Sequence, residues 1–208
     1  MTSAQVHDTA LLIGDVRLGT GVEILPYTVI YGPAVIGDDT RIGPHAVIGT
    51  APQYRAHLRD DTRGEVRIGA RTVIREHVSV HRPAWTDATT IGNDVIVMAG
   101  AVINHDCRID DGVVITSNVA LAGTVFVMEG ANLGQSCSVH QRTVIGAHTR
   151  IAMGATVLDD VPPCSTFIPG KPLKSNDAGV AAAATSPLGP DGIAARYELL
   201  RAETGRIR

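Results

Sequence analysis

An aliphatic residue recurs at every sixth position along most of this chain, and this spacing restricts the possible folds more than any other feature. A second stripe of small or branched residues stands two positions before each aliphatic residue of the longest run. Apolar residues in an α-helix recur three and four positions apart, so a six-residue period excludes a helical solenoid. The longest unbroken run is Ile91, Val97, Ile103, Ile109, Ile115, Leu121, Val127, Leu133, Val139, Ile145, Ile151 and Val157.

Each six-residue unit reads as one short strand followed by one corner. Side chains two positions apart lie on the same face of a strand, so the two stripes are the inward residues. Three units make one triangular coil, and the chain returns to the same corner after eighteen residues, about 4.8 Å further along the axis. We therefore predict an all-β fold, a parallel β-helix, with a core of small aliphatic residues; aromatic residues make up only 3% of the chain.

The repeats define one main domain, residues 1–173, with two interruptions. The first repeats run from Leu12 to Ile48, and irregular polar segments follow at 50–67 and 81–90. Two adjacent prolines, Pro162 and Pro163, cannot donate to a strand ladder and end the repeats. Residues 174–208 are predicted to be a linker, up to residue 190, and one short helix. Helical spacing of apolar residues marks that helix: Ile193, Tyr197 and Leu200.

Composition excludes several functional classes. The net charge is −3 and no basic run is present, so we expect no nucleic-acid partner. No stretch of about eighteen apolar residues occurs and the first residues lack a signal-peptide layout, so we expect no membrane span and a cytoplasmic location. The 3 cysteines lack metal-ligand spacing.

The eighteen-residue coil places three polar or small residues in one column: His105, Gly123 and Gln141. A histidine above a residue without a side chain is the arrangement of a general base facing backbone N–H groups. The alternatives are a structural histidine and a glycine that serves a backbone with positive φ. Asn104 and Asp106 flank His105 in the sequence.

Several segments resemble the UDP-N-acetylglucosamine O-acyltransferases of lipid A biosynthesis, over roughly residues 10–172. Both interruptions also lie where that family places its loops. The resemblance implies a left-handed coil, a homotrimer and no tightly bound cofactor or metal. The matching segments are residues 74–82, Asn104-His105-Asp106-Cys107, Leu121-Ala122-Gly123, Val139-His140-Gln141 and Asp160-Val161-Pro162-Pro163.

The resemblance also implies roles for individual residues. His105 is then the general base, Asp106 polarises it, and the N–H of Gly123 stabilises the oxyanion. Asn104, His140 and Gln141 belong to the substrate and acyl site, which lies between subunits. The donor is then an acyl thioester, on acyl carrier protein or coenzyme A, and the acceptor is a hydroxyl or amine of a sugar, which in the family is nucleotide-linked.

Some positions depart from the family pattern. Val102 and Thr124 replace two further site histidines, and Tyr54 replaces an acidic residue that contacts the sugar. A bulky residue, Met153, stands where the family often has a small one that admits a long acyl chain, and it predicts a short donor if it faces the groove. The helical C-terminal domain of the family is reduced to the short tail.

Basic residues are candidate contacts for the phosphates of the carrier: Arg75, Arg82 and Lys171. Exposed basic residues at corners are also common without any function. We expect His77 and His81 to be structural or interface residues, and no task for the remaining histidines at positions 7, 45, 57 and 148.

Three other functions compete with this interpretation. Residues 103–107 and 169–174 are also similar to acetyl-CoA-dependent sugar O- and N-acetyltransferases, which usually carry an additional N-terminal domain. A non-catalytic hexapeptide scaffold has no need of the His105 column. A γ-carbonic-anhydrase-like zinc site would need three gathered histidines, and His77, His81 and His105 are the only candidate set.

Overall fold

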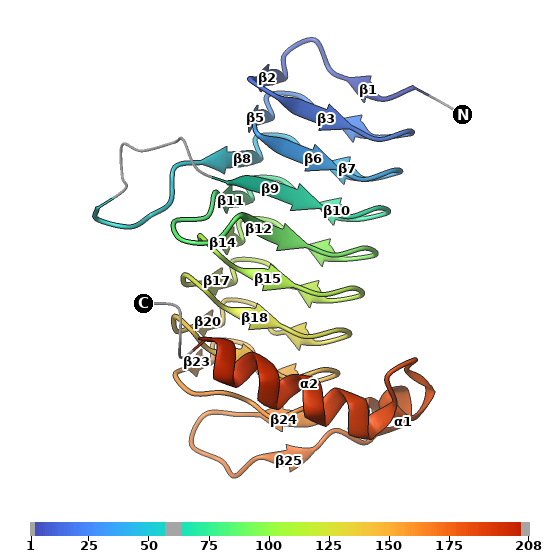
Figure 1. The fold of residues 1–208 in the computed structure, drawn as a ribbon, viewed down its shortest axis with the longest axis vertical. Helices are drawn as coiled ribbons and strands as arrows, with labels where there is room; N and C mark the ends of the chain where they lie inside the picture. The colour runs from blue at the N-terminus through green and yellow to red at the C-terminus, as the bar shows by residue number, and fades with distance from the viewer. Residues whose placement is uncertain (1–2, 57–63, 205–208) are drawn as a thin grey trace.

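A computed structural model of the chain describes residues 3–56 and 64–204, and it confirms the predicted left-handed parallel β-helix. Three parallel sheets form the three faces of a tall prism, with the N-terminus at one end and two helices at the other (Figure 1). His57 and residues 58–63 of the first interruption lie outside the described residues. No helix within the described ranges is long and apolar enough to span a bilayer.

Up to β23 each face takes every third strand, so consecutive strands lie on consecutive faces, and β24 and the antiparallel β25 then extend sheet A. Sheet A contains β1 (Gln5–Val6), β4 (Glu23–Ile24), β7 (Arg41–Ile42), β10 (Val73–Ile74), β13 (Ile96–Val97), β16 (Val114–Ile115), β19 (Asn132–Leu133), β22 (Arg150–Ile151), β24 (Ser165–Phe167) and β25 (Lys174–Ser175). Sheet B contains β2 (Leu11–Ile13), β5 (Val29–Tyr31), β8 (Val47–Thr50), β11 (Ser79–His81), β14 (Val102–Ile103), β17 (Ala120–Leu121), β20 (Ser138–Val139) and β23 (Thr156–Val157). Sheet C contains β3 (Val16–Leu18), β6 (Ala34–Ile36), β9 (Glu65–Ile68), β12 (Ala88–Ile91), β15 (Arg108–Ile109), β18 (Phe126–Val127) and β21 (Val144–Ile145).

The repeat aliphatics form a single core along the prism axis. Ile103 pairs with Leu121 and Leu121 pairs with Val139 in neighbouring coils, which is the predicted register. All three side chains are buried, together with the small residues two positions before each of them. Stacking of identical inward positions therefore both fills the core and fixes which corners lie above one another.

Both interruptions leave the prism at the same edge. They follow β8 and β11, the two strands of sheet B that precede β9 and β12 of sheet C. We call the corners that join sheet B to sheet C the B-to-C edge, and those that join sheet A to sheet B the A-to-B edge. The described first and last residues of these loops, 51–56 and 64 for the first and 82–87 for the second, lie beside the coil that carries His105.

The C-terminal tail differs from the prediction in one respect. The segment expected to be a linker contains β25 and a helix, α1 (Asp177–Thr185), before the expected helix, α2 (Gly189–Thr204). Four consecutive alanines, the best helix formers, favour α1, and Ala183 is buried against the apolar side of α2. A linker was expected because glycine, serine and proline residues flank the alanines, and the contact of α1 with α2 is not visible in the sequence.

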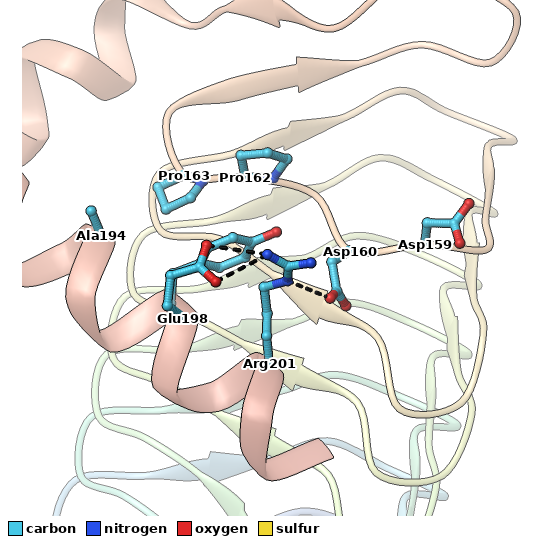
Figure 2. Close-up of a pocket in the computed structure, with 8 residues that line it drawn as sticks. Asp159, Asp160, Pro162, Pro163, Ala194, Glu198 and Arg201 are labelled. Carbon is cyan, nitrogen blue, oxygen red and sulfur yellow. Dashed lines mark hydrogen bonds and ion pairs between the residues drawn. The ribbon is translucent and has the colours of Figure 1, made fainter. Parts of the chain in front are cut away.

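The second helix covers the C-terminal part of sheet C. Ile193, Tyr197 and Leu200 are buried against Phe126 and Val144, whose strands belong to that sheet. Ion pairs surround this apolar contact, from Arg196 to Asp110 and Glu129 and from Arg108 to Glu203. Arg201 pairs with Asp160 and Glu198 (Figure 2).

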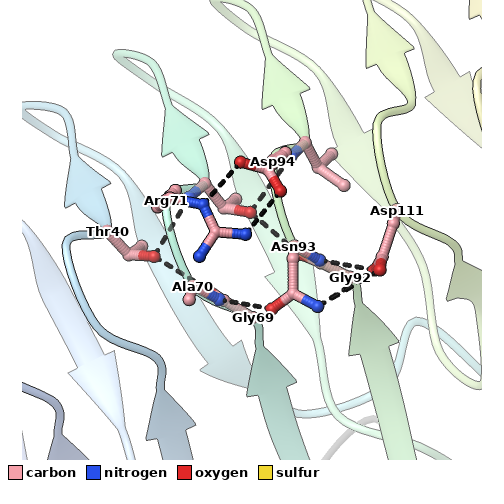
Figure 3. A network of polar contacts seen from close by, with 10 residues as sticks. Thr40, Gly69, Ala70, Arg71, Gly92, Asn93, Asp94 and Asp111 are labelled. Atoms are coloured by element: carbon pink, nitrogen blue, oxygen red, sulfur yellow. Dashed lines mark hydrogen bonds and ion pairs between the residues drawn. The ribbon is translucent and has the colours of Figure 1, made fainter.

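A polar network stabilises the corners that join sheet C to sheet A (Figure 3). The Asn93 carboxamide accepts a hydrogen bond from the N–H of Ala70 at 2.9 Å and donates to Asp111 in the next coil. An exposed ion pair between Arg71 and Asp94 adds a second link between the coil of Ala70 and the coil of Asn93. The polar side chains at these corners are bound to one another, and the candidate catalytic residue His105 lies at the B-to-C edge instead.

Candidate active site

His105 lies at a corner of the B-to-C edge and is almost fully buried. The corner follows β14, and Asp106 makes the turn with a φ of +61°. The imidazole is only 5% exposed. The register places Gly123 and Gln141 at the same corner of the following two coils, as the eighteen-residue spacing predicts.

Gly123 lies directly against the imidazole of His105. A Cβ atom at position 123 would lie 2.2 Å from Cε1 and 2.4 Å from Nε2 of the histidine. Its φ is not positive; Thr124, with a φ of +62°, makes the turn instead. Position 123 therefore requires glycine because of the space that the imidazole occupies. The N–H of Gly123 has no hydrogen-bond acceptor within the described part of the chain.

The carboxylate of Asp106 joins His105 to the second loop. One oxygen, Oδ2, accepts from Nδ1 of His105 at 2.8 Å and from the N–H of Ala84 at 3.0 Å. The other oxygen accepts from the N–H groups of Trp85 and Thr86 and from the Thr86 hydroxyl, at 3.1, 2.8 and 2.7 Å. One carboxylate thus orients the imidazole and also fixes the turn at 84–86.

These contacts keep Asp106 ionised although its side chain is buried. Burial alone would raise its pKa, but the hydrogen bonds from His105, Thr86 and Ala84 outweigh this effect and lower the pKa to about 2. A charged Asp106 favours the His105 tautomer with its proton on Nδ1. That tautomer leaves Nε2 as a proton acceptor, and no described residue hydrogen-bonds to Nε2.

Two aromatic side chains from the two loops lie beside His105. The ring centroid of Trp85 is 4.9 Å from that of His105 with the planes at 83°, and the ring of Tyr54 is 5.9 Å away at 64°. The two aromatic rings contact each other at 4.8 Å. Tyr54 was expected at this site from the sequence, whereas Trp85 was not; the signal that could have indicated it is the position of the single tryptophan in the second loop.

His81 is a further buried histidine near this site. Its Nδ1 lies 2.9 Å from the carbonyl oxygen of Ala51 and 3.0 Å from the Thr50 hydroxyl, so it holds the start of the first loop. Nε2 is buried without a partner among the described residues. Burial lowers the pKa of His81, and repulsion from His105 adds to this effect. A structural role was predicted for His81, and its hydrogen bonds to the loop fit that role.

Polar atoms without partners gather around the His105 corner. The Asn104 amide donates to the carbonyl of Leu121, but its Oδ1 is buried and has no partner within residues 3–56 and 64–204. The Thr124 hydroxyl is also buried without a hydrogen-bond partner among the described residues. His140 and Gln141 are exposed at the corner two coils beyond His105. Buried polar groups are usually satisfied, so those of Asn104 and Thr124 are exceptions among the described residues.

Other residues selected from the sequence lie away from this corner of the same chain. Arg75 and Met153 are on the A-to-B edge, where Arg75 pairs with Glu76 and Met153 is 76% exposed. Lys171 is exposed between β24 and β25. Arg82 is buried and its guanidinium donates to the carbonyl of Gly32, so this placement argues against the expected contact with a carrier phosphate.

The histidine set considered for a zinc site is not assembled within one chain. His77 is on the A-to-B edge, where it stacks on His45 with ring centroids 5.1 Å apart, whereas His81 and His105 lie at the B-to-C edge. Within the described residues, no group of three or more His, Cys, Asp or Glu side chains is arranged to hold a metal ion.

A cavity of about 490 Å³ lies further along the B-to-C edge, between α2 and the corner after β23 (Figure 2). Three carboxylates line it, and the cationic Arg201 is already paired with two of them, Asp160 and Glu198. Asp159 stands three coils beyond His105 in the same column, about 14 Å at the usual strand spacing. Three carboxylates against one guanidinium leave the cavity lining negatively charged, so it is unsuitable for the diphosphate of a nucleotide substrate.

Comparisons with known proteins agree with this geometry. The family model for bacterial transferase hexapeptide (six repeats) matches residues 4–50 and 88–123, a range that includes His105 and Gly123. An acyl-(acyl-carrier-protein)–UDP-N-acetylglucosamine O-acyltransferase of Herminiimonas arsenicoxydans is 36% identical over 182 residues, which cover 77% of this chain and 68% of the relative. A protein of the same name from Gloeothece citriformis is 37% identical over 150 residues, 70% of this chain and 52% of the relative.

Solved structures of the same kind superpose on the whole fold. The UDP-N-acetylglucosamine acyltransferase of Francisella novicida gives a TM-score of 0.76 at 29% identity and covers 96% of this chain and 78% of its own. The corresponding Arabidopsis enzyme gives 0.69 at 25% identity, with 94% and 81% covered. The resemblance found in the sequence is confirmed, and the chain belongs to the UDP-N-acetylglucosamine O-acyltransferase family of hexapeptide-repeat acyltransferases.

Proposed function

We propose that this chain transfers an acyl group from an acyl carrier protein thioester to a hydroxyl of UDP-N-acetylglucosamine or a closely related nucleotide sugar. The relatives are named for this reaction. The single observation that supports it best is the arrangement of His105, fixed by Asp106 and packed on Gly123, with no described residue bound to Nε2. Because both proposed substrates are cytoplasmic molecules, we place the reaction in the cytoplasm.

The proposed step is a direct transfer with His105 as general base. Nε2 of His105 removes the proton of the acceptor hydroxyl while the oxygen forms a bond to the thioester carbonyl carbon. The C–S bond then breaks, and the leaving thiolate of the carrier takes the proton back from the imidazolium. Asp106 stabilises the imidazolium between these two proton transfers, because its carboxylate stays charged.

The N–H of Gly123 is the proposed donor to the oxyanion. It has no acceptor within residues 3–56 and 64–204, and it belongs to the residue that contacts the catalytic imidazole. A fixed donor aimed at the developing charge is worth more than one that must reorient during the reaction. Asn104, His140 and Gln141 are proposed to bind the substrates, since they lie in the same coil or two coils further along the same edge.

We further propose a homotrimer in which sheet B faces the threefold axis. Sheets A and C carry charged outward residues such as Glu23, Arg41 and Arg108, and α2 covers part of sheet C. The outward residues of sheet B are uncharged and mostly small: Leu11, Val29, Val47, Ser79, Val102, Ala120, Ser138 and Thr156.

Threefold packing on sheet B brings the A-to-B edge of one chain against the B-to-C edge of the next. His105 then faces residues of a neighbouring chain, and Met153 and Arg75 of that neighbour become candidates for the acyl groove and the carrier contact. An exposed methionine in that groove predicts a short acyl donor. Lys171 and Arg82 remain weaker candidates for the carrier, because one is remote and the other is buried.

A thioester-release assay tests the proposal. Purified protein is supplied with UDP-N-acetylglucosamine and a panel of acyl chains on acyl carrier protein or coenzyme A, and product is identified by mass spectrometry. We expect transfer from acyl carrier protein, and a loss of about 10²- to 10⁴-fold in kcat for His105→Ala. The exposed His7, replaced by alanine, is the control. Unchanged turnover in His105→Ala would exclude this mechanism.

A further inference from the structure

We infer that Trp85, together with Tyr54, determines acceptor specificity by stacking on the sugar ring that carries the reacting hydroxyl. This inference rests on the proposed function, because it takes His105 to be the base. Trp85 and Tyr54 are 37% and 39% exposed, whereas His105 is 5% exposed. The two rings therefore form the accessible surface next to a nearly buried imidazole.

The position of the rings selects the part of the substrate that they meet. A general base acts within hydrogen-bond distance of the hydroxyl, so the sugar ring lies next to Nε2 of His105. The centroids of the Trp85 and Tyr54 rings are 4.9 and 5.9 Å from that of the imidazole, so both rings border the position of a sugar whose hydroxyl meets Nε2. The acyl carbonyl is instead directed to Gly123, and a nucleotide base is too far along the substrate to reach these rings.

The chemistry of the two side chains fits a sugar. The C–H face of a pyranose is apolar and packs on aromatic rings, while its hydroxyls keep their hydrogen bonds at the rim. Neither ring carries a charge, so the pair offers no ion pair to a phosphate. Tyrosine and tryptophan also each present one polar atom, the hydroxyl and the indole N–H, that can meet a sugar hydroxyl.

Asp106 makes the Trp85 wall rigid. The carboxylate that accepts from His105 at 2.8 Å also accepts from the N–H of Trp85 itself at 3.1 Å. The N–H groups of Ala84 and Thr86 hold the turn on both sides of the tryptophan. The base and the aromatic wall thus share one anchor, which sets their relative position before the substrate binds.

The first test uses Trp85 as its own reporter, because it is the 1 tryptophan of the chain. We expect UDP-N-acetylglucosamine, added without any acyl donor, to change the tryptophan emission saturably in wild type and in His105→Ala. Uridine diphosphate, which lacks the sugar, is expected to leave the emission unchanged. Tyr54→Ala is expected to weaken the response to UDP-N-acetylglucosamine about tenfold.

The second test separates binding of the acceptor from binding of the donor. Trp85→Ala is expected to raise the KM for the nucleotide sugar about tenfold and to leave the KM for the acyl carrier within about twofold. Trp85→Phe keeps a ring and should stay within about threefold of wild type for both. Leu199→Ala, which removes an exposed apolar side chain of α2 away from the A-to-B and B-to-C edges, is the control.

The outcomes distinguish this inference from the proposed function. Acyl transfer with no emission change, or equal KM values in Trp85→Ala and wild type, would overturn the inference and leave the function intact. A saturable emission change without acyl transfer would show that the nucleotide sugar meets Trp85, but it would reject the function and with it the role of Trp85 in choosing an acyl acceptor. If neither transfer nor an emission change occurs, both are wrong. Melting curves of each variant identify a folding defect, and Trp85→Phe supplies the comparison in that case.

Discussion

A Cβ atom on Gly123 would lie 2.2 Å from Cε1 of His105, so the two residues cannot keep their positions if residue 123 has a side chain. We predict that Gly123→Ala displaces the imidazole from Asp106 and lowers kcat by at least about 100-fold. The fold itself should persist, because the aliphatic core does not include this residue. Steady-state kinetics and thermal melting measure the two effects.

The matched control for this change is Gly192→Ala. Gly192 lies in α2, where a Cβ atom would meet only the side chain of Leu188, at 3.3 Å or more. Alanine is the better helix former, so we expect a small gain in stability and unchanged kcat. Wild-type activity in Gly123→Ala would mean that the imidazole can move without losing its function.

Because the pKa of Asp106 is lowered in the folded chain, we predict that the protein loses stability in acid. That pKa is about 2 in the folded chain against an ordinary value of 3.8, so the unfolded chain binds more protons between these values. This contribution, about 2 kcal/mol, is fully present above pH 4 and is lost as the pH falls toward 2. Urea unfolding at several pH values measures it.

Asp106→Asn removes the titrating group and should flatten the stability curve between pH 4 and pH 2. The carboxamide oxygen can still accept from part of the 84–86 turn, so we expect a folded variant. Its kcat should fall by about 10²-fold or more, because a neutral amide no longer selects the His105 tautomer. If the free energy of unfolding of Asp106→Asn falls as steeply between pH 4 and pH 2 as that of wild type, the loss of stability in acid is due to other carboxylates.

We predict a second, separate effect of pH on stability from the buried side chain of His81. Burial lowers its pKa below the ordinary value of 6.5, so the unfolded chain binds more protons below that pH. The stability that the neutral His81 provides is present above pH 6.5 and is lost as the pH falls below it. We expect the melting temperature to decrease from pH 7.5 to 5.5, and His81→Asn to reduce that slope. The exposed His7, replaced by asparagine, should leave the slope unchanged.

The packing of α2 on sheet C makes a stability prediction. Ile193 is 1% exposed among Phe126, Val144 and Leu200. Ile193→Ala should lower the free energy of unfolding by about 2–4 kcal/mol, because it leaves a cavity. Leu199→Ala on the same helix, with a side chain that is 71% exposed, should change it by less than about 0.5 kcal/mol. Equal effects would mean that α2 does not rest on the sheet.

The repeat made the fold and the His105 column predictable for one physical reason. Each inward position is specified by its own aliphatic residue, so a shift of register would expose a whole stripe of the core. Counting eighteen residues from His105 therefore reaches Gly123 without any knowledge of the structure. The same rule places His77 on another edge, and counting coils would have excluded it from a three-histidine site.

The surroundings of His105 could not be predicted in this way. Trp85 reaches the imidazole because backbone N–H groups of its own turn bind Asp106, and no periodic pattern encodes such contacts. His81 is placed by hydrogen bonds to the first loop. In α1, alanines with weak amphipathic spacing are stabilised by contact with α2, which depends on the packing of distant segments.

Both loops leave the prism at one edge, and this has a consequence for how relatives of this chain can diverge. Each coil is hydrogen-bonded only to the coils above and below it, so additional residues at a corner extend sideways and leave the ladder intact. Replacement of side chains in these two surface segments would then alter the choice of acceptor, provided that the backbone N–H groups at 84–86 still bind Asp106.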